Sequence, residues 1–221
     1  MLRINSRNRS DGLTMLRALK TGSVALAFCD PQYRTGLDKL KYGNEGTRQI
    51  ARYALPQMGD ELIREFMTEI DRTLCPSGHC LLWMDKLALV EHVWERWCVD
   101  ATLLPVDLIT WRKHKIGMGY RTRRRVEHLL VLQKPPVRSS GIWRDKGIPD
   151  DWQEPNGWEA QYITWPTTSH PHRKPVSLQE RLIRCVTRPG DLVVDPCAGS
   201  YSVLDACRLA GRDFLGCDLL P

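Results

Sequence analysis

The 221-residue sequence lacks several features that mark familiar classes of protein. It has eight cysteines but no Cys-x-x-Cys pair, and its cysteine and histidine spacing fits no usual zinc pattern, so no metal is expected. No apolar run approaches the roughly 20 residues of a membrane span, and the opening residues MLRINSRNRS have no signal-peptide core. These absences predict a reduced, soluble, cytoplasmic protein.

The glycine motif of nicotinamide-dependent enzymes is also missing. A nicotinamide site favours G-x-G-x-x-G, and the one comparable turn offers only Gly199. What is present is a globular balance of 42% hydrophobic and 26% charged residues, with a net charge of +6. The excess of positive charge favours a polyanionic partner and the composition favours a packed core, whereas the missing glycine motif argues against a dehydrogenase.

Hydrophobic periodicity predicts strands and helices in alternation. Such alternation is typical of a three-layer α/β fold with a mostly parallel, twisted sheet, expected here as a single domain over residues 1–221. The expected strands are 24–28, 75–84 (after a turn), 106–113, 126–134, 191–195 and 212–218, and the expected helices are 11–22, 60–74, 85–98, 177–187 and 200–210. Residues 34–56 are expected to form a mobile loop, and residues 134–165, rich in Pro, Gly and Trp, show no period.

One buried strand ends in an unusual corner. The run Val24 to Phe28 leads into Asp30-Pro31-Gln32-Tyr33. Taken alone, Asp-Pro is most simply the start of a β-turn.

A second strand ends in a similar way near the C-terminus. Asp195-Pro196 is followed by the small-residue turn Ala198-Gly199-Ser200, a helix, and a further strand that ends at Asp218. A small turn lets backbone approach a ligand, a helix N-terminus presents free N–H groups, and the later acid can accept from ribose hydroxyls. Any tight βα turn would explain the glycine alone, but the full combination favours a nucleotide-type site.

These two corners, with HPHRKPVSLQERLI between them, resemble the amino-DNA methyltransferases, as do the paired strands LITWRKHK…RRRVEHLLVLQK. The resemblance runs from about residue 8 to residue 218 and implies a Rossmann-like methyltransferase fold that uses S-adenosyl-L-methionine. Because the Asp-Pro-x-Tyr motif precedes the cofactor turn, the order resembles the permuted β group of the family.

The resemblance also implies roles for individual residues. Asp30 and the Pro31 carbonyl would accept hydrogen bonds from the target amine, and Tyr33 would stack on the flipped base. Asp11, by itself most simply a helix N-cap, would also meet the cofactor adenine. The full set of implied cofactor residues is Asp11, Asp30, Lys174, Pro175, Asp195, Ala198, Gly199, Ser200, Ser202 and Asp218.

Two positions depart from the family pattern. Gln32 replaces a proline, and Tyr201 stands where a small residue is usual, so its ring would either crowd the methionine end of the cofactor or point away. Asp30 favours adenine N6 as the target, since cytosine-N4 enzymes more often resemble Ser-Pro-Pro-Tyr. The alternatives are cytosine-N4 methylation and a catalytically silent DNA-binding module.

Seven cations lie between Trp111 and Arg125. A solvated loop would explain them, but their density suits a grip on the phosphates of double-stranded DNA. They are Arg112, Lys113, Lys115, Arg121, Arg123, Arg124 and Arg125. Residues 134–165 are the candidate target-recognition insert, although their tryptophans would also suit a satellite core. The insert is short, which favours a short target or help from a second subunit in a homodimer. The resemblance also implies methylation of the restriction-modification kind.

Overall fold

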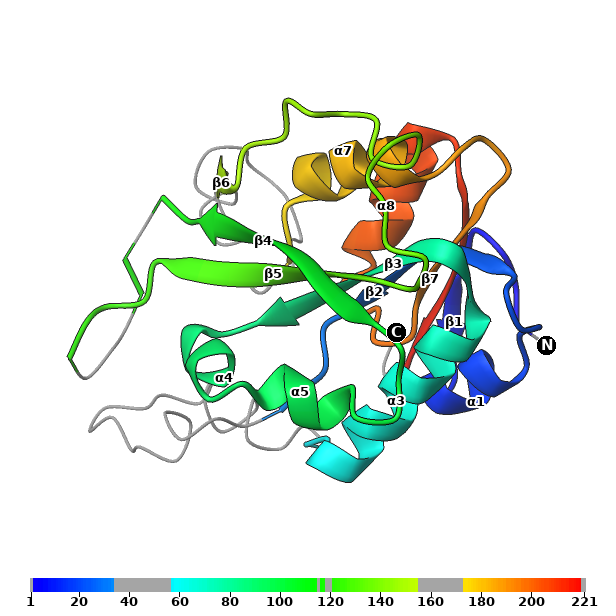
Figure 1. The fold of residues 1–221 in the computed structure, drawn as a ribbon, viewed down its shortest axis with the longest axis horizontal. Coiled ribbons are helices and arrows are strands. Elements are labelled where there is room, and N and C mark those ends of the chain that lie inside the picture. Colours follow the sequence, from blue (N-terminus) through cyan, green and yellow to red (C-terminus); the bar gives the residue numbers. More distant parts are fainter. Residues whose placement is uncertain (1, 34–56, 115, 118–120, 155–172, 220–221) are drawn as a thin grey trace.

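A computed structural model describes residues 2–33, 57–114, 116–117, 121–154 and 173–219. An eight-stranded sheet of order β1-β8-β7-β2-β3-β5-β4-β6 runs through its centre (Figure 1). The strands are β1 Arg7–Arg9, β2 Val24–Cys29, β3 Leu74–Met84, β4 Leu104–Arg112, β5 Val126–Gln133, β6 Asp151–Gln153, β7 Leu192–Asp195 and β8 Asp213–Asp218.

Most neighbouring strands are parallel. Strands β1, β8, β7, β2 and β3 run in one direction, and β5 is antiparallel to both β3 and β4. From β2 the chain returns through helix α3 to β3 on one side, whereas from β7 it returns through α8 to β8 on the other. The carboxyl ends of β2 and β7 therefore flank a topological switch point, where open α/β sheets bind their ligands.

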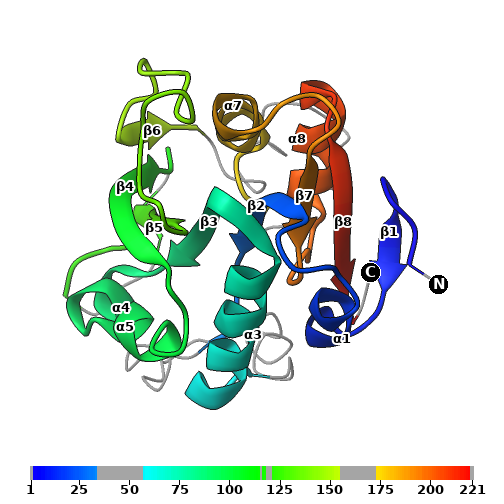
Figure 2. The same ribbon diagram turned by 45° about the vertical axis from the view of Figure 1, so that its right-hand side comes forward.

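Helices cover both faces of the sheet, as Figure 2 shows. Helices α1 (Gly12–Arg17), α3 (Asp60–Thr73) and α5 (Val93–Trp97) contribute to one hydrophobic cluster, and α7 (Val176–Val186) and α8 (Ser202–Ala210) contribute to the other. This arrangement confirms the three-layer α/β fold with a mostly parallel sheet.

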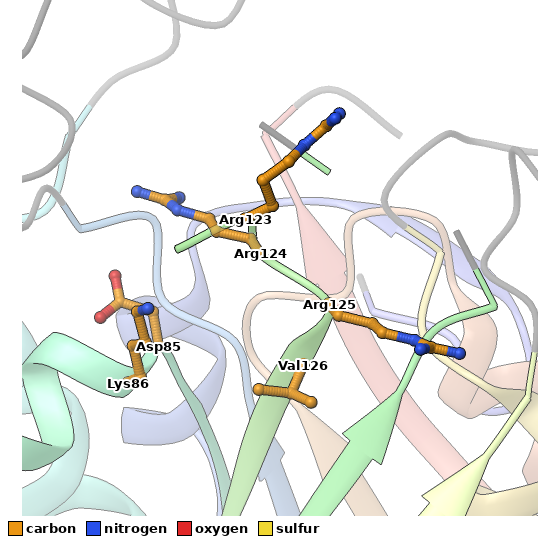
Figure 3. Close-up of a pocket in the computed structure, with 6 residues that line it drawn as sticks. All are labelled: Asp85, Lys86, Arg123, Arg124, Arg125 and Val126. Carbon is orange, nitrogen blue, oxygen red and sulfur yellow. The ribbon is translucent and has the colours of Figure 1, made fainter. Parts of the chain in front are cut away.

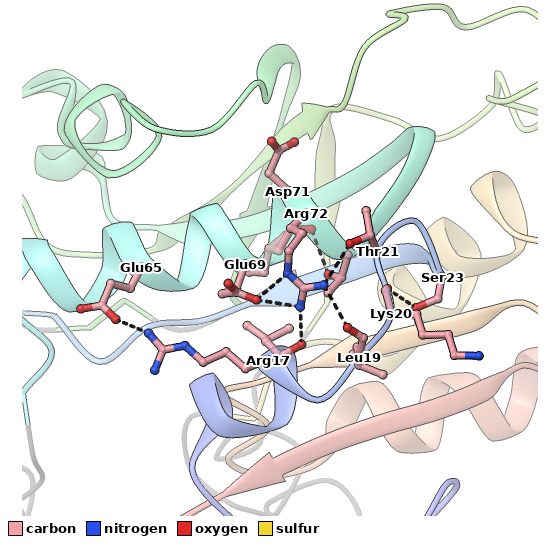
Figure 4. Close-up of polar contacts among 12 residues, drawn as sticks. Arg17, Leu19, Lys20, Thr21, Ser23, Glu65, Glu69, Asp71 and Arg72 are labelled. Carbon is pink, nitrogen blue, oxygen red and sulfur yellow. Dashed lines mark hydrogen bonds and ion pairs between the residues drawn. The ribbon is translucent and has the colours of Figure 1, made fainter.

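The Arg72 guanidinium group on α3 helps to anchor α1. The apolar side of α3 is buried through Ile63, Phe66 and Ile70, which follows its amphipathic spacing. On its polar side, Arg72 donates from Nη2 to the Leu16 carbonyl and from Nη1 to the Leu19 carbonyl, each at 2.9 Å (Figure 4). These bonds tie α3 to the carbonyl of Leu16 near the end of α1 and to that of Leu19 just after it.

The helix expected over residues 85–98 is instead two short helices. Helix α4 (Lys86–Val90) begins at Asp85, whose Oδ1 accepts from two backbone amides, and α5 follows after His92, which has a left-handed φ of 52°. In one continuous helix Ala88 and Trp97, nine residues apart, would face opposite sides. Both are buried, so the break is what allows both to reach the core.

The turn expected at the start of residues 75–84 is an irregularity inside a longer strand. Strand β3 begins at Leu74, and its pairing with β2 shifts register between Val24 and Leu26. Ser77 takes a positive φ of 63° at this bulge. The three-residue strands β1 and β6 were not predicted from the pattern. Within the described ranges no helix is long and apolar enough to cross a membrane.

Candidate active site

The Asp30 corner lies at the switch point, directly after β2. The Asp30 side chain is 43% exposed, whereas Pro31 is buried. The Pro31 carbonyl accepts from the Tyr33 amide at 3.0 Å, and the Gln32 carbonyl accepts from the Met58 amide at 2.8 Å. A carbonyl oxygen has two lone pairs, so that of Pro31 keeps capacity for a second donor, and the turn forms with Gln32 in place of the family's proline.

Tyr33 is fixed at both ends of its side chain. Its hydroxyl accepts from the Asp85 amide at 2.8 Å, and its ring packs edge-to-face on Trp97 with centroids 4.9 Å apart. These contacts hold an aromatic ring three residues after Asp30.

The second corner forms a glycine turn at the carboxyl ends of β7 and β8. The Ala198 amide donates to the Cys217 carbonyl at 3.1 Å, and the Gly199 amide donates to Asp218 Oδ2 at 3.1 Å. Gly199 has a positive φ of 44°, and a Cβ there would come no closer than 3.9 Å to its nearest neighbour, the Cys197 carbonyl. The turn is therefore open toward a ligand at Gly199.

Helix α1 brings Asp11 to this turn. Asp11 Oδ2 accepts from the Thr14 amide at 2.6 Å, which confirms the N-cap. The preceding Ser10 amide donates to the Asp218 carbonyl. Gly12 packs so tightly that a Cβ would lie 2.2 Å from the Pro196 carbonyl oxygen, so only glycine allows α1 to start here.

Asp195 lies deeper, with 5% of its surface exposed. Its Oδ1 accepts from the Cys197 amide at 3.1 Å. Burial raises the pKa of Asp195 to about 8, and the carboxylates of Asp30 and Asp218 add to the increase. Acidic groups thus gather where the two corners meet.

Tyr201 points away from the turn, which resolves the second departure from the family pattern. Its hydroxyl donates to the Asn8 carbonyl at 2.7 Å and accepts from the Asn8 amide at 3.2 Å. The ring is 1% exposed and packs against Phe214. Tyr201 therefore fastens β1 to the sheet and leaves the crest of the turn clear.

The remaining residues of the implied cofactor set surround these corners. Pro175 is the N-cap of α7, Ser200 is half-buried in the turn, and Ser202 is buried as the first residue of α8. The thiols of Cys29, at the end of β2, and Cys197 lie close enough to affect each other's pKa, so the two corners are adjacent.

Lys174 lies against the Asp30 corner. Its Nζ is 3.1 Å from Asp30 Oδ2 and 2.6 Å from Glu127 Oε2, and it lies 4.8 Å from the centre of the Trp83 ring. Neither Glu127 nor Trp83 was identified from the sequence. The sequence offered one signal for Glu127: it is the single acid in the mostly apolar strand β5. This strand directly follows the four arginines of the 121–125 stretch.

Most cations of the basic stretch are exposed, but several have partners within the protein. Lys113 pairs with Glu127, and Arg112 pairs with Asp151. Arg121, Arg123 and Arg125 are exposed, and the last two donate to the Gly117 and Lys113 carbonyls. A pocket lies beside α4, and in Figure 3 Arg125 extends to the side away from Asp85. The residues that line this pocket are Asp85, Lys86, Arg123, Arg124, Arg125 and Val126. Lys115 lies outside the described residues.

The described part of the candidate insert packs on α7. Trp143 and Trp152 contact the cluster beneath α7, and Arg181 on α7 pairs with Asp145 at 2.6 Å. These tryptophans form a satellite of the core, as the sequence allowed. Residues 155–165 of the insert, like the expected loop at 34–56, lie outside the described residues.

Comparison with known proteins decides the family. A DNA methylase family model matches residues 17–221. The chain belongs to the N6/N4 amino-DNA methyltransferase family. The type II methyltransferase M.HhaII of Haemophilus parahaemolyticus is 45% identical over 219 residues, which cover 98% of this chain and 92% of that protein.

Two solved structures share the fold of this amino-DNA methyltransferase. The cytosine-N4-specific PvuII DNA methyltransferase has a TM-score of 0.69 at 19% identity, over 97% of this chain and 81% of that one. The protein TTHA0409 of Thermus thermophilus, solved with S-adenosyl-L-methionine, has a TM-score of 0.64 at 21% identity, over 97% and 89%. The fold is therefore the Rossmann-like methyltransferase fold. Membership of the family makes the protein a DNA methyltransferase that uses S-adenosyl-L-methionine.

The second corner fits this cofactor chemically. The methyl donor carries a positive sulfonium and a positive ammonium group, and the corner supplies the carboxyl groups of Asp11 and Asp218 beside the open Gly199 turn, with Asp195 buried behind them. Over the described part of the chain, no group of three or more acidic, histidine or cysteine side chains is arranged to hold a metal ion.

Proposed function

We propose that this methyltransferase methylates the N6 amino group of adenine at a specific sequence in double-stranded DNA. The observation that carries the proposal is the half-exposed Asp30 carboxylate, which lies at the switch point within 3.1 Å of the Lys174 ammonium. A hydrogen-bond acceptor at this edge of the sheet is what the amine chemistry requires.

The chemistry follows from the weakness of the nucleophile. The lone pair of an adenine amino group is delocalised into the ring, and acceptors aimed at its hydrogens favour a tetrahedral nitrogen with a usable lone pair. Asp30 and the Pro31 carbonyl are those acceptors. When bound, S-adenosyl-L-methionine would supply the methyl group: a carbon–nitrogen bond forms, the sulfur–carbon bond breaks with its electron pair going to sulfur, and the nitrogen releases its extra proton to solvent water.

Residues at the second corner hold the cofactor in this proposal. Asp218 accepts from the ribose hydroxyls, because a carboxylate that receives the Gly199 amide on one oxygen retains further lone pairs. Asp11 serves the adenine end. The methionine side is lined by Asp195, Ala198, Gly199, Ser200 and Ser202, with Asp30, Lys174 and Pro175 beside it.

Tyr33 stacks on the flipped base, held by its contacts to Asp85 and Trp97. The exposed arginines around the pocket in Figure 3 grip DNA phosphates. Residues 134–165 contribute to target recognition, and because this insert is short, a second copy of the chain completes it. The name of M.HhaII, a type II methyltransferase, supports methylation of the restriction-modification kind.

Cytosine-N4 methylation is the second candidate, because the structurally similar PvuII enzyme is cytosine-N4-specific. The Asp30 carboxylate favours adenine over this alternative. A catalytically silent DNA-binding module is less well supported, since Tyr201 leaves the cofactor turn clear.

Mass spectrometry of nucleosides distinguishes the three. Unmethylated bacterial DNA is incubated with the protein and S-adenosyl-L-methionine and then digested. We expect N6-methyladenine; N4-methylcytosine would establish the second candidate, and no methylated nucleoside from a protein that binds the cofactor would establish the third.

A further inference from the structure

Four charged side chains form a continuous row that ends at the catalytic corner. Lys113 contacts Glu127, Glu127 Oε2 lies 2.6 Å from Lys174 Nζ, and Lys174 Nζ lies 3.1 Å from Asp30 Oδ2. They come from four separate places: the residue after β4, strand β5, the segment before α7 and the residue after β2. The charges alternate, so each inner group has a partner of opposite sign on both sides.

The row is shielded inside and open at Asp30. The side-chain exposure is 13% for Lys174 and 26% for Glu127, but 43% for Asp30. The buried ring of Trp83, itself 2% exposed, lies against the Lys174 ammonium. Shielded ion pairs gain little net stability, because removing charges from water costs about as much as their attraction returns. Stability alone is therefore a weak reason for this row.

The electrostatic environment makes Asp30 dependent on Lys174. Loss of water raises the pKa of the Asp30 carboxyl, and the Lys174 charge is the largest opposing effect. Of the other charged groups facing Asp30, Glu127 on β5 raises its pKa, Lys113 lowers it, and Asp195 on β7 interacts with it as a further acid. Without Lys174, Asp30 would face two acids with only Lys113 to offset them.

We infer that Lys174 is a positioning residue for Asp30, held in place by Glu127 and Lys113, so that Asp30 meets the target amine as an oriented carboxylate. Lys174 engages Oδ2, which assigns Oδ1 to the amine. This inference rests on the proposed function. It places Lys174 on the side of the target base, in addition to or in place of the cofactor contact that the family resemblance implies.

The test compares Lys174→Met with Lys174→Arg and with the adjacent control Arg173→Met. Arg173 pairs with Asp205 on α8 at 2.6 Å, so its loss removes a neighbouring cation without touching the row. The measurements are the calorimetric affinity for S-adenosyl-L-methionine and the rate of methyl transfer to unmethylated bacterial DNA, with enzyme in excess, from pH 5.5 to 9.

We expect Lys174→Met to bind the cofactor within about threefold of wild type, yet to lose methyl transfer roughly a hundredfold at pH 7, the loss typical of one preorganised electrostatic contact. The acidic limb of its pH–rate profile should move to higher pH, because Asp30 then protonates more easily. Lys174→Arg should restore most of the rate and the position of that limb, and Arg173→Met should match wild type.

Glu127→Gln provides a second test if Lys174→Met does not fold. We expect the rate of methyl transfer by this variant to fall at least about tenfold while its cofactor affinity is unchanged, because the Lys174 ammonium then loses one of its two charged partners. If wild type is active and Lys174→Met keeps the same rate and pH profile, the inference is overturned while the proposed function stands. The same holds if Lys174→Met loses only cofactor affinity. A wild-type protein that binds the cofactor but methylates no DNA would instead refute the proposed function.

Discussion

At the scale of single residues, the corners were predictable and the row behind them was not. Asp30, Asp195 and Asp218 each end a strand of clear hydrophobic pattern, so their common edge follows from a parallel sheet. Glu127 stands near the start of an apolar strand far from either corner in sequence. Its contact with Lys174 arises only when β5 pairs antiparallel with β3, a register that no local pattern reveals.

Asp30→Ala tests the catalytic corner directly. Methyl transfer should fall by a hundred- to thousandfold, because removing one preorganised acceptor costs about 2.7–4 kcal/mol of barrier. Cofactor affinity should remain close to normal, since we propose that the second corner holds most of the cofactor. Rates and calorimetric affinities are compared with those of Asp107→Ala, which removes an exposed carboxyl on β4. Methylation by Asp30→Ala at the wild-type rate would refute the assignment.

At the scale of elements, tertiary contacts decide what local patterns leave open. The expected helix over 85–98 has neither glycine nor proline inside it, and it breaks because Ala88 and Trp97 must both reach the core. Strand β1 is only three residues long, too short to recognise from alternation. It is held to β8 by pairing and to Tyr201 by two hydrogen bonds.

Tyr201→Phe tests this attachment of β1. The ring would still pack on Phe214, but the buried Asn8 amide and carbonyl would each lose a partner. Unsatisfied buried polar groups cost about 1–3 kcal/mol, so the free energy of unfolding in urea should fall by about that amount. Cofactor affinity serves as the control and should not change, because the hydroxyl faces away from the turn. A variant as stable as wild type would show that Tyr201 does not secure β1.

At the scale of the whole molecule, a cluster of exposed positive charge lies at one edge of the sheet. The exposed arginines of the 121–125 stretch lie beyond the carboxyl edge of the sheet, beside the Asp85 pocket. Replacing Arg123, Arg124 and Arg125 together by Gln should reduce the slope of log affinity against log salt by up to about 3, since each phosphate contact contributes about 0.9. DNA binding would be followed by fluorescence anisotropy of a labelled duplex.

The matched control for DNA binding replaces Lys20 and Arg188 by Gln. Both are exposed, and they precede β2 and β7, at the opposite edge of the sheet. This variant should keep the wild-type salt slope. Equal slopes in the arginine variant and in wild type would show that those arginines do not contact phosphates.

The buried Asp195 couples the stability of the whole fold to pH. Its pKa is about 8 in the folded protein, above the ordinary value of 3.8. Between these values the folded state binds more protons than the unfolded state, so the contribution of Asp195 to stability falls as the pH rises from about 4 to about 8. A pKa difference of one corresponds to about 1.4 kcal/mol.

Asp195→Asn should remove this loss, because an amide does not titrate. The free energy of unfolding in urea would be measured for both proteins at pH 5, 6.5 and 8, without cofactor. The variant should gain stability relative to wild type at each step upward in pH, and Asp107→Asn on the exposed side of β4 corrects for the general effect of losing one charge. A difference between Asp195→Asn and wild type that stays constant from pH 5 to 8 would mean that the Asp195 carboxyl is already ionised at pH 5. Asp195 would then carry a negative charge in the folded protein beside the carboxyl groups of Asp30 and Asp218.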